Sequence, residues 1–95
     1  MVVSRLQGLS PNEAQQVIVT AQAIETGGPD LAFARLAPLL ALHPEHPEIL
    51  RLQAGIQNLR GDYDGAIATM KHALAKRPRD PLYFNTLGAI LGQAG

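Results

Sequence analysis

Three histidines are the side chains in this sequence best suited to chemistry. His43 and His46 are three residues apart and lie beside Glu45 and Glu48, and imidazole and carboxylate groups are ligands that zinc accepts. Two imidazoles in a proline-bounded turn do not complete a tetrahedral set, so we interpret them as solvated turn residues and expect no metal. His72 has no acid or serine at a spacing that would make it a general base, and we interpret it as a surface histidine.

Other motifs that could support catalysis or phosphate binding are incomplete. The pair Gly27-Gly28 is not followed by the lysine or the further glycines of a phosphate-binding loop, and it suits the end of a helix better. The sequence has no cysteine, which excludes cysteine nucleophiles, thiolate zinc sites and disulfides. We therefore expect no enzyme activity and no cofactor in this segment.

Charge and hydropathy indicate neither a nucleic-acid nor a membrane partner. Eight acidic and eight basic residues cancel over 95 residues, so no net charge attracts the chain to polyanions. A basic cluster has no interleaved aromatic residues and is better explained as favourable charge at a helix C-terminus; it comprises Lys71, Lys76, Arg77 and Arg79. No apolar run reaches the ~18–20 residues that a membrane span needs. We expect a cytoplasmic protein.

The elements that carry these residues follow from a repeat with a period of 34 residues. Gly27, Gly61 and Gly95 are 34 positions apart, and so are Pro44 and Pro78. Ala and Leu supply 14 residues each, whereas Val, Ile and Thr together supply only 14, which favours helix over sheet. A period of this length is typical of stacked helical units.

The glycine, proline and capping residues of the repeat predict five helices with short turns between them. A capping box and prolines mark the helix starts, and glycine marks several ends. Pro38 interrupts the second helix, where we expect a bend or a loosened last turn. The predicted helices span residues 11–26, 29–42, 47–60, 63–76 and 81–93.

Two segments carry a family resemblance. One matches the second helix of a repeat and reads Gly61-Asp62-Tyr63-Asp64-Gly65-Ala66-Ile67, followed by Ala73-Leu74 and Pro78. The other, residues 81–95, is similar to the first helix of a repeat. Phe84 occupies the position of a large residue, and Leu87-Gly88 occupies the position where a small residue lets two helices cross closely. Both resemble the tetratricopeptide repeat family, whose 34-residue helix–turn–helix units end near proline.

The resemblance implies an all-α fold, a right-handed α-solenoid of antiparallel helix pairs. A single domain would span residues 11–95, with units at about 13–46, 47–80 and a shortened 81–95, after an N-terminal tail or cap at 1–10. The last unit contains only a first helix, so we expect the native protein to continue.

The same resemblance implies a protein-interaction module that binds a peptide or partner helix in a concave groove lined by the first helices. Mapped by position, the predicted groove contacts are Arg51, Asn58 and Asn85. Relatives that bind acidic chaperone tails use a clamp of basic and amide side chains, but this chain has Val17 and Ala21 where the clamp would begin. We therefore do not expect a chaperone-tail adaptor.

Two alternative functions stay open at this level. The segment would serve as the N-terminal regulatory or docking arm of a larger bacterial enzyme, of sulfotransferase, glycosyltransferase or hydroxylase type. Alternatively, it would be a self-assembly element in which the groove receives another copy of the chain. Separately, the last helix has no following helix to cover part of it, so we expect a homodimer through this exposed helix. The residues predicted to mediate self-association are Tyr83, Phe84, Leu87, Ile90 and Leu91.

Overall fold

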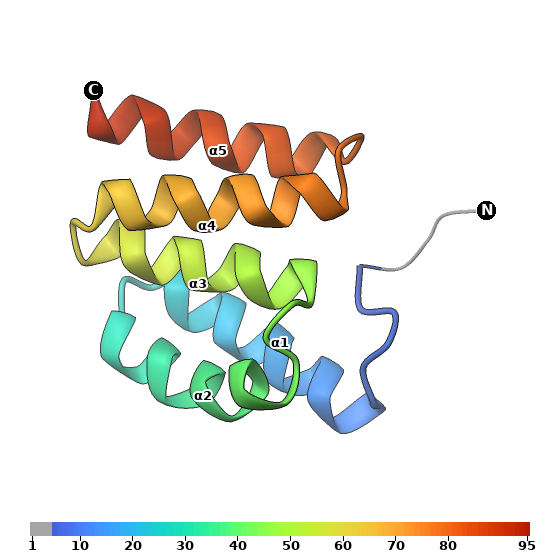
Figure 1. Cartoon of the computed structure of the whole chain (residues 1–95). Helices are drawn as coiled ribbons and strands as arrows, with labels where there is room; N and C mark the ends of the chain where they lie inside the picture. The colour runs from blue at the N-terminus through green and yellow to red at the C-terminus, as the bar shows by residue number, and fades with distance from the viewer. Residues whose placement is uncertain (1–4) are drawn as a thin grey trace.

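A computed structural model describes residues 5–95, which form five helices and no strand (Figure 1). The bounds agree with the predicted ranges to within one residue at every helix end, and the all-helical prediction is confirmed. Part of the predicted N-terminal tail or cap, residues 1–4, lies outside the described residues. The helices are α1 (Pro11–Glu25), α2 (Pro29–Leu42), α3 (Pro47–Leu59), α4 (Tyr63–Lys76) and α5 (Pro81–Ala94).

Side-chain caps begin several of the helices. At α1 the Ser10 hydroxyl accepts a hydrogen bond from the Glu13 N–H at 3.1 Å, and the Glu13 carboxylate accepts one from the Ser10 N–H at 2.9 Å. The pKa of Glu13 is lowered, chiefly by the hydrogen bond from the Ser10 backbone and then by the contact with His43. Asp62 and Asp80 accept backbone N–H groups at the starts of α4 and α5. These contacts satisfy donors that the first turn of a helix leaves unpaired.

Glycine in the left-handed region ends α1 and α3. Gly27 has φ of +77° and Gly61 has φ of +80°, a conformation that costs other residues energy because of the Cβ atom. The two glycines are one repeat apart. The period of the sequence therefore marks equivalent chain reversals in successive units.

Helix α2 continues through Pro38 and ends at Leu42. The His43 N–H donates to the Leu39 carbonyl at 2.8 Å, so α-helical bonding resumes directly after the proline. The last turn is thus not loosened, although Pro38 itself cannot donate a backbone hydrogen bond.

The helices lie in two rows. Each helix packs against the next one along the chain, α1 contacts α3, and α3 contacts α5. Helices α2 and α4 do not contact each other, and α3 lies between them in Figure 1. Helices α1, α3 and α5 therefore form an inner row and α2 and α4 an outer row. Stacked antiparallel pairs of this kind build a solenoid, in which each unit contacts its neighbours.

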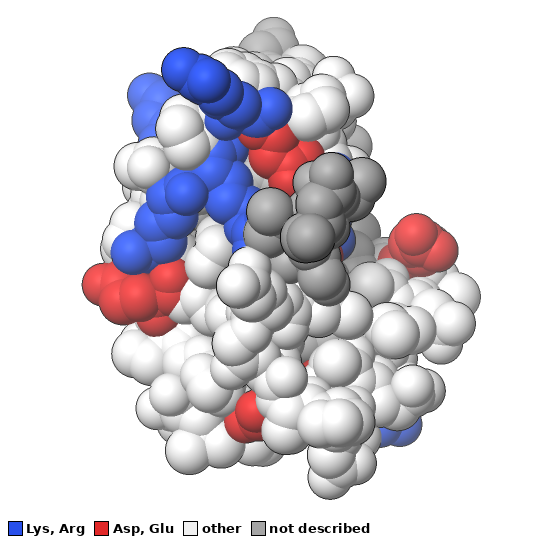
Figure 2. Space-filling view, turned by 90° about the vertical axis from the view of Figure 1, so that its right-hand side faces the viewer, with Lys and Arg blue, Asp and Glu red and all other residues white. Residues whose placement is uncertain are grey.

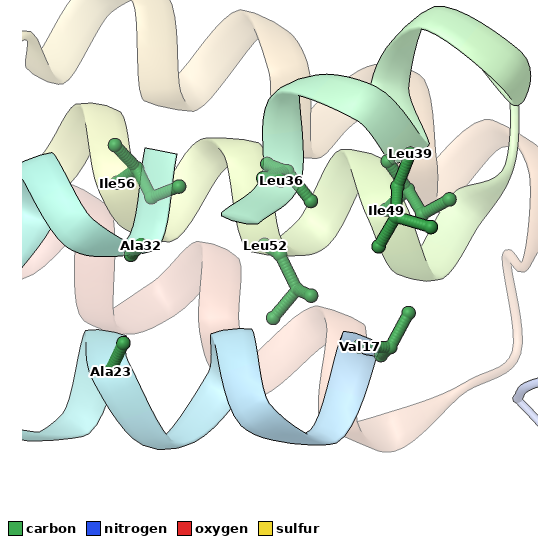
Figure 3. Packing of buried hydrophobic residues seen from close by; sticks show 8 residues of the cluster. All are labelled: Val17, Ala23, Ala32, Leu36, Leu39, Ile49, Leu52 and Ile56. Carbon is green, nitrogen blue, oxygen red and sulfur yellow. The ribbon is translucent and has the colours of Figure 1, made fainter. Parts of the chain in front are cut away.

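Helix α3 belongs to two hydrophobic clusters. The first cluster joins α1, α2 and α3, and Figure 3 shows Val17 and Ala23 of α1 pointing toward the side chains of the other two helices. The second joins α3, α4 and α5 around Leu50, Ala54 and Tyr83. Ala54 of α3, with Ala66 and Ala73 of α4, is fully buried, and such short side chains let these helices approach closely.

Residues 5–9, here named the N-terminal strap, cross the ends of the units. The Arg5 guanidinium donates to both carboxylate oxygens of Asp80 at 2.9 and 2.8 Å, and Arg77 donates to the Arg5 carbonyl at 3.3 Å. Leu6 and Leu9 pack against the first cluster. The strap therefore links the first unit to the start of α5.

Candidate functional site

The inner row carries a concavity of about 180 Å³, which is the candidate site. All three inner helices contribute to its wall. Most of the lining is apolar, and polar groups come from only three residues. The lining residues are Ala21, Ile24 and Glu25 of α1, Arg51, Leu52 and Gly55 of α3, and Thr86 of α5.

A network of buried polar groups lies beside the concavity. The Arg51 guanidinium donates to the two carboxylate oxygens of Glu48 at 2.9 and 2.8 Å. The Tyr83 hydroxyl donates to Glu48 Oε1 at 2.9 Å. The Glu48 side chain is only 8% exposed and that of Arg51 is 20% exposed, so both charges are largely removed from water. The network ties α3 to α5 by a polar contact inside the second cluster.

The electrostatics of the network follow from burial and pairing. Burial alone would raise the pKa of Glu48, but the hydrogen bonds and charge of Arg51 outweigh it and hold the pKa below its usual range. The pKa of Tyr83 is raised, first by burial and then by the negative charge of Glu48. Glu48 is therefore ionised and Tyr83 neutral at pH 7, and the positive charge of Arg51 is compensated.

Of the three predicted groove contacts, the structure brings only Arg51 to the concavity. Asn58 lies further along α3 and is partly buried, and its Oδ1 has no hydrogen-bond partner among the described residues. Asn85 is exposed on α5, outside the lining. The three residues are thus spread along the inner row and do not form one cluster.

The predicted self-association residues of α5 divide into buried and exposed side chains. Tyr83 and Ile90 belong to the second cluster and are 0% and 2% exposed, so the prediction that they are left uncovered is wrong. They are buried because α3 and α4 cover that face of α5. Leu87 is partly buried, and Phe84 and Leu91 are 53% and 47% exposed.

Mapping by repeat position also places Ala21 and Gly55 on the groove face, but sequence reasoning missed the other four residues of the lining: Ile24, Glu25, Leu52 and Thr86. The repeat offered one means of finding a member of this set. Leu52 and Thr86 are 34 positions apart, so they occupy equivalent places on α3 and α5. Ile24 and Glu25 follow Ala21 by three and four residues, the spacing of one helix face.

The two turn histidines make protein contacts, so the expectation that they are simply solvated is wrong. His43 Nε2 lies 2.8 Å from the Glu13 carboxylate. His46 Nε2 lies 2.8 Å from the Gln7 carbonyl, while its Nδ1 accepts the Glu48 N–H at 3.2 Å. Both therefore hold turns in place, and residues 5–95 contain no group of three or more side chains able to share a metal.

The basic cluster is mixed with acidic groups. Figure 2 shows Lys and Arg gathered over the end of the molecule near the α4–α5 turn, with acidic side chains directly beside them. Lys76 lies 3.7 Å from Glu45, and His72 lies 2.8 Å from the same carboxylate. His72 is half-exposed, as expected of a surface histidine. The cluster is therefore not a uniform positive field.

Comparison with known proteins agrees with this geometry. A family model described as "Tetratricopeptide repeat" matches residues 23–90, more than two thirds of the chain. No curated protein and no solved structure matches it. Among the described residues, no helix combines the length and apolar character of a membrane span.

Proposed function

Because the chain belongs to the tetratricopeptide repeat family, we propose that its concave inner row binds a segment of a partner protein. Repeats of this family generally mediate protein–protein interaction. The proposed ligand is an extended peptide or a helix, and the proposed location is the cytoplasm. In this reading the segment has no catalytic role of its own, and nucleic acid is not its partner.

The observation that carries the proposal is the concavity on α1, α3 and α5. Its volume of about 180 Å³ is below the ~300–1,000 Å³ of pockets that enclose drug-sized ligands. It suits one side chain of a longer segment that lies across the inner row. The buried network of Glu48, Arg51 and Tyr83 fixes α3 and α5 to each other, so this part of the surface is formed before the ligand arrives, which reduces the cost of binding.

Gly55 offers a direct test, because a Cβ atom at this position would face α1 across the concavity, 3.4 Å from an Ile24 methyl carbon. Peptides selected from a random dodecapeptide library are expected to bind the native chain. The Gly55→Leu variant fills the concavity and is expected to weaken that binding at least tenfold, or about 1.4 kcal/mol. Isothermal titration calorimetry measures the affinities.

Gly88→Leu is the matched control, because Gly88 also lies in a helix but is exposed. A Cβ atom added at this position would have no neighbouring atom within 4 Å. It should bind the selected peptides as the native chain does. Circular dichroism and thermal melting of both variants establish that each is folded. The proposal fails if no peptide is selected, or if the selected peptides bind the Gly55→Leu variant as tightly as the native chain.

A second candidate function, self-association through α5, is favoured by the exposure of Phe84 and Leu91. The segment Pro81–Ala94 contains no charged residue, so two copies of it would bring no like charges together. A Cβ atom added at Gly92 would meet nothing within 4 Å, which leaves room for a second copy to approach the helix beside Leu91. Apolar surface of this kind favours association.

Replacing both Phe84 and Leu91 with serine tests this candidate with little effect on the core, since both side chains are about half-exposed. The native chain is expected to form dimers at tens of micromolar, and the double variant is expected to stay monomeric. Light scattering with size-exclusion chromatography measures both masses. A strictly monomeric native chain at those concentrations would rule out self-association through α5.

A further inference from the structure

We infer that the concavity receives an arginine or lysine side chain from an extended segment of the partner protein. This inference rests on the proposed function, because it names the chemistry of the ligand of the same site. In this arrangement the aliphatic stem lies on the apolar lining and the cationic head pairs with Glu25. Long basic side chains commonly bury their stems while keeping the charge near water.

Glu25 is the only acidic residue of the lining, and its carboxylate has no ion-pair or hydrogen-bond partner among residues 5–95. It is exposed and is the last residue of α1, whose last turn contains no basic residue. The C-terminal end of a helix carries partial negative charge, so an acidic side chain there is unfavourable to the helix. Carboxylate and helix end together create a negative potential that a cation relieves.

The other polar groups of the lining do not oppose a cation. The charge of Arg51 is compensated by Glu48, which binds it through two hydrogen bonds and is itself buried. The Thr86 hydroxyl donates to the Leu82 carbonyl at 2.8 Å, which leaves its oxygen lone pairs as acceptors. An acidic ligand would find no uncompensated cation here, whereas a basic ligand finds a carboxylate and a hydroxyl oxygen.

Elsewhere the chain already pairs an arginine that lies outside the helices with an acid at a helix end. Arg5 of the N-terminal strap binds both oxygens of Asp80 at the start of α5. This contact lowers the pKa of Asp80 and raises that of Arg5, mainly through their hydrogen bonds. Asp80 is therefore occupied, and Glu25 is the acid of the inner row that is left for a partner.

N-butylguanidinium, which reproduces the arginine side chain, is the probe for this site, and neutral N-butylurea is its control of matched shape. In NMR titrations of the native chain, N-butylguanidinium is expected to shift the Ile24 methyl and Gly55 amide resonances and to bind more tightly than N-butylurea. The Glu25→Gln variant is expected to bind N-butylguanidinium about three- to fivefold more weakly, the range of a solvent-accessible ion pair.

The controls separate a ligand site from a general charge effect. Asp64→Asn removes the same charge from an exposed position in the first turn of α4 and should leave binding unchanged. Glu25→Gln should also raise the melting temperature slightly, because it removes an unfavourable charge from the end of α1. A merely structural role of Glu25 would lower it.

Equal binding of the two probes, equal binding by the Glu25→Gln variant, or shifts confined to residues outside the lining would each overturn the inference. These outcomes are distinguishable from failure of the proposed function. If the selected peptides fail to bind the Gly55→Leu variant but bind the Glu25→Gln variant with native affinity, the proposed interaction surface is retained. Only its preference for a basic side chain is then overturned.

Discussion

Replacing Arg51 with methionine is expected to lower the free energy of unfolding by about 3 kcal/mol at pH 7. The substitution keeps most of the apolar stem but removes the guanidinium that donates two hydrogen bonds to Glu48. It leaves a carboxylate that is 8% exposed with no cation in direct contact, and breaking a buried pair in this way typically costs ~3–5 kcal/mol. Urea denaturation followed by circular dichroism measures the change.

A double variant identifies the cause of that loss. The double variant Arg51→Met with Glu48→Gln should be more stable than Arg51→Met alone, since it removes the uncompensated charge while the amide oxygen still accepts the Tyr83 hydroxyl. A double variant that is less stable than the single one would show that packing of Arg51, and not its charge, accounts for the effect.

The pH dependence has a definite sign. The pKa of Glu48 is lowered in the folded chain, so its contribution to stability is complete above the unfolded-state pKa of about 4.3 and is lost as the pH falls through the folded-state value. In the Arg51→Met variant burial raises that pKa instead, so protonation favours the folded state. The difference between native and variant chains should therefore shrink between pH 7 and pH 3.

Replacing Leu36 with alanine is expected to lower the free energy of unfolding by a similar amount, about 3 kcal/mol. Leu36 of α2 is fully buried in the first cluster, beside Ile49 and Leu52 of α3 (Figure 3). Removing its branched end leaves a cavity between three helices, and buried Leu→Ala substitutions cost ~2–5 kcal/mol depending on how far the site collapses. The midpoint of urea denaturation measures the loss.

Leu31→Ala is the matched control on the same helix. Leu31 is 55% exposed, so the same substitution removes little buried area and is expected to change stability by less than ~0.5 kcal/mol. Similar losses at the two positions would mean that helix propensity, and not packing against α3, determines the stability of α2.

The elements were predictable from local residue types. Serine, aspartate and proline at helix starts, and glycine at Gly27 and Gly61, depend on contacts within a few residues, which one sequence displays directly. The period of 34 residues then predicts that successive pairs stack, because a helix pair cannot bury its apolar face alone. The five helix ranges therefore follow from the sequence without knowledge of distant contacts.

The site was less predictable because its residues meet across helices. Tyr83 was expected on an uncovered face, yet its partner is Glu48, 35 positions earlier. The repeat gave one indication that Tyr83 is buried, because the equivalent residue 34 positions earlier, Ile49, is also apolar and fully buried. Which polar group Tyr83 reaches depends on how α3 and α5 are placed in space, and no local pattern specifies that. Glu25 was missed because an exposed acid at a helix end has no distinctive spacing.

The N-terminal strap changes how the stack behaves as a whole. A linear array whose members touch only their neighbours is able to melt from either end, one helix at a time. The Arg5–Asp80 pair joins residues 75 positions apart, so the strap contacts the start of α5 as well as the first hydrophobic cluster. Detaching the first turn of α5 then also breaks this pair, so undocking of the start of α5 and release of residues 5–9 become coupled.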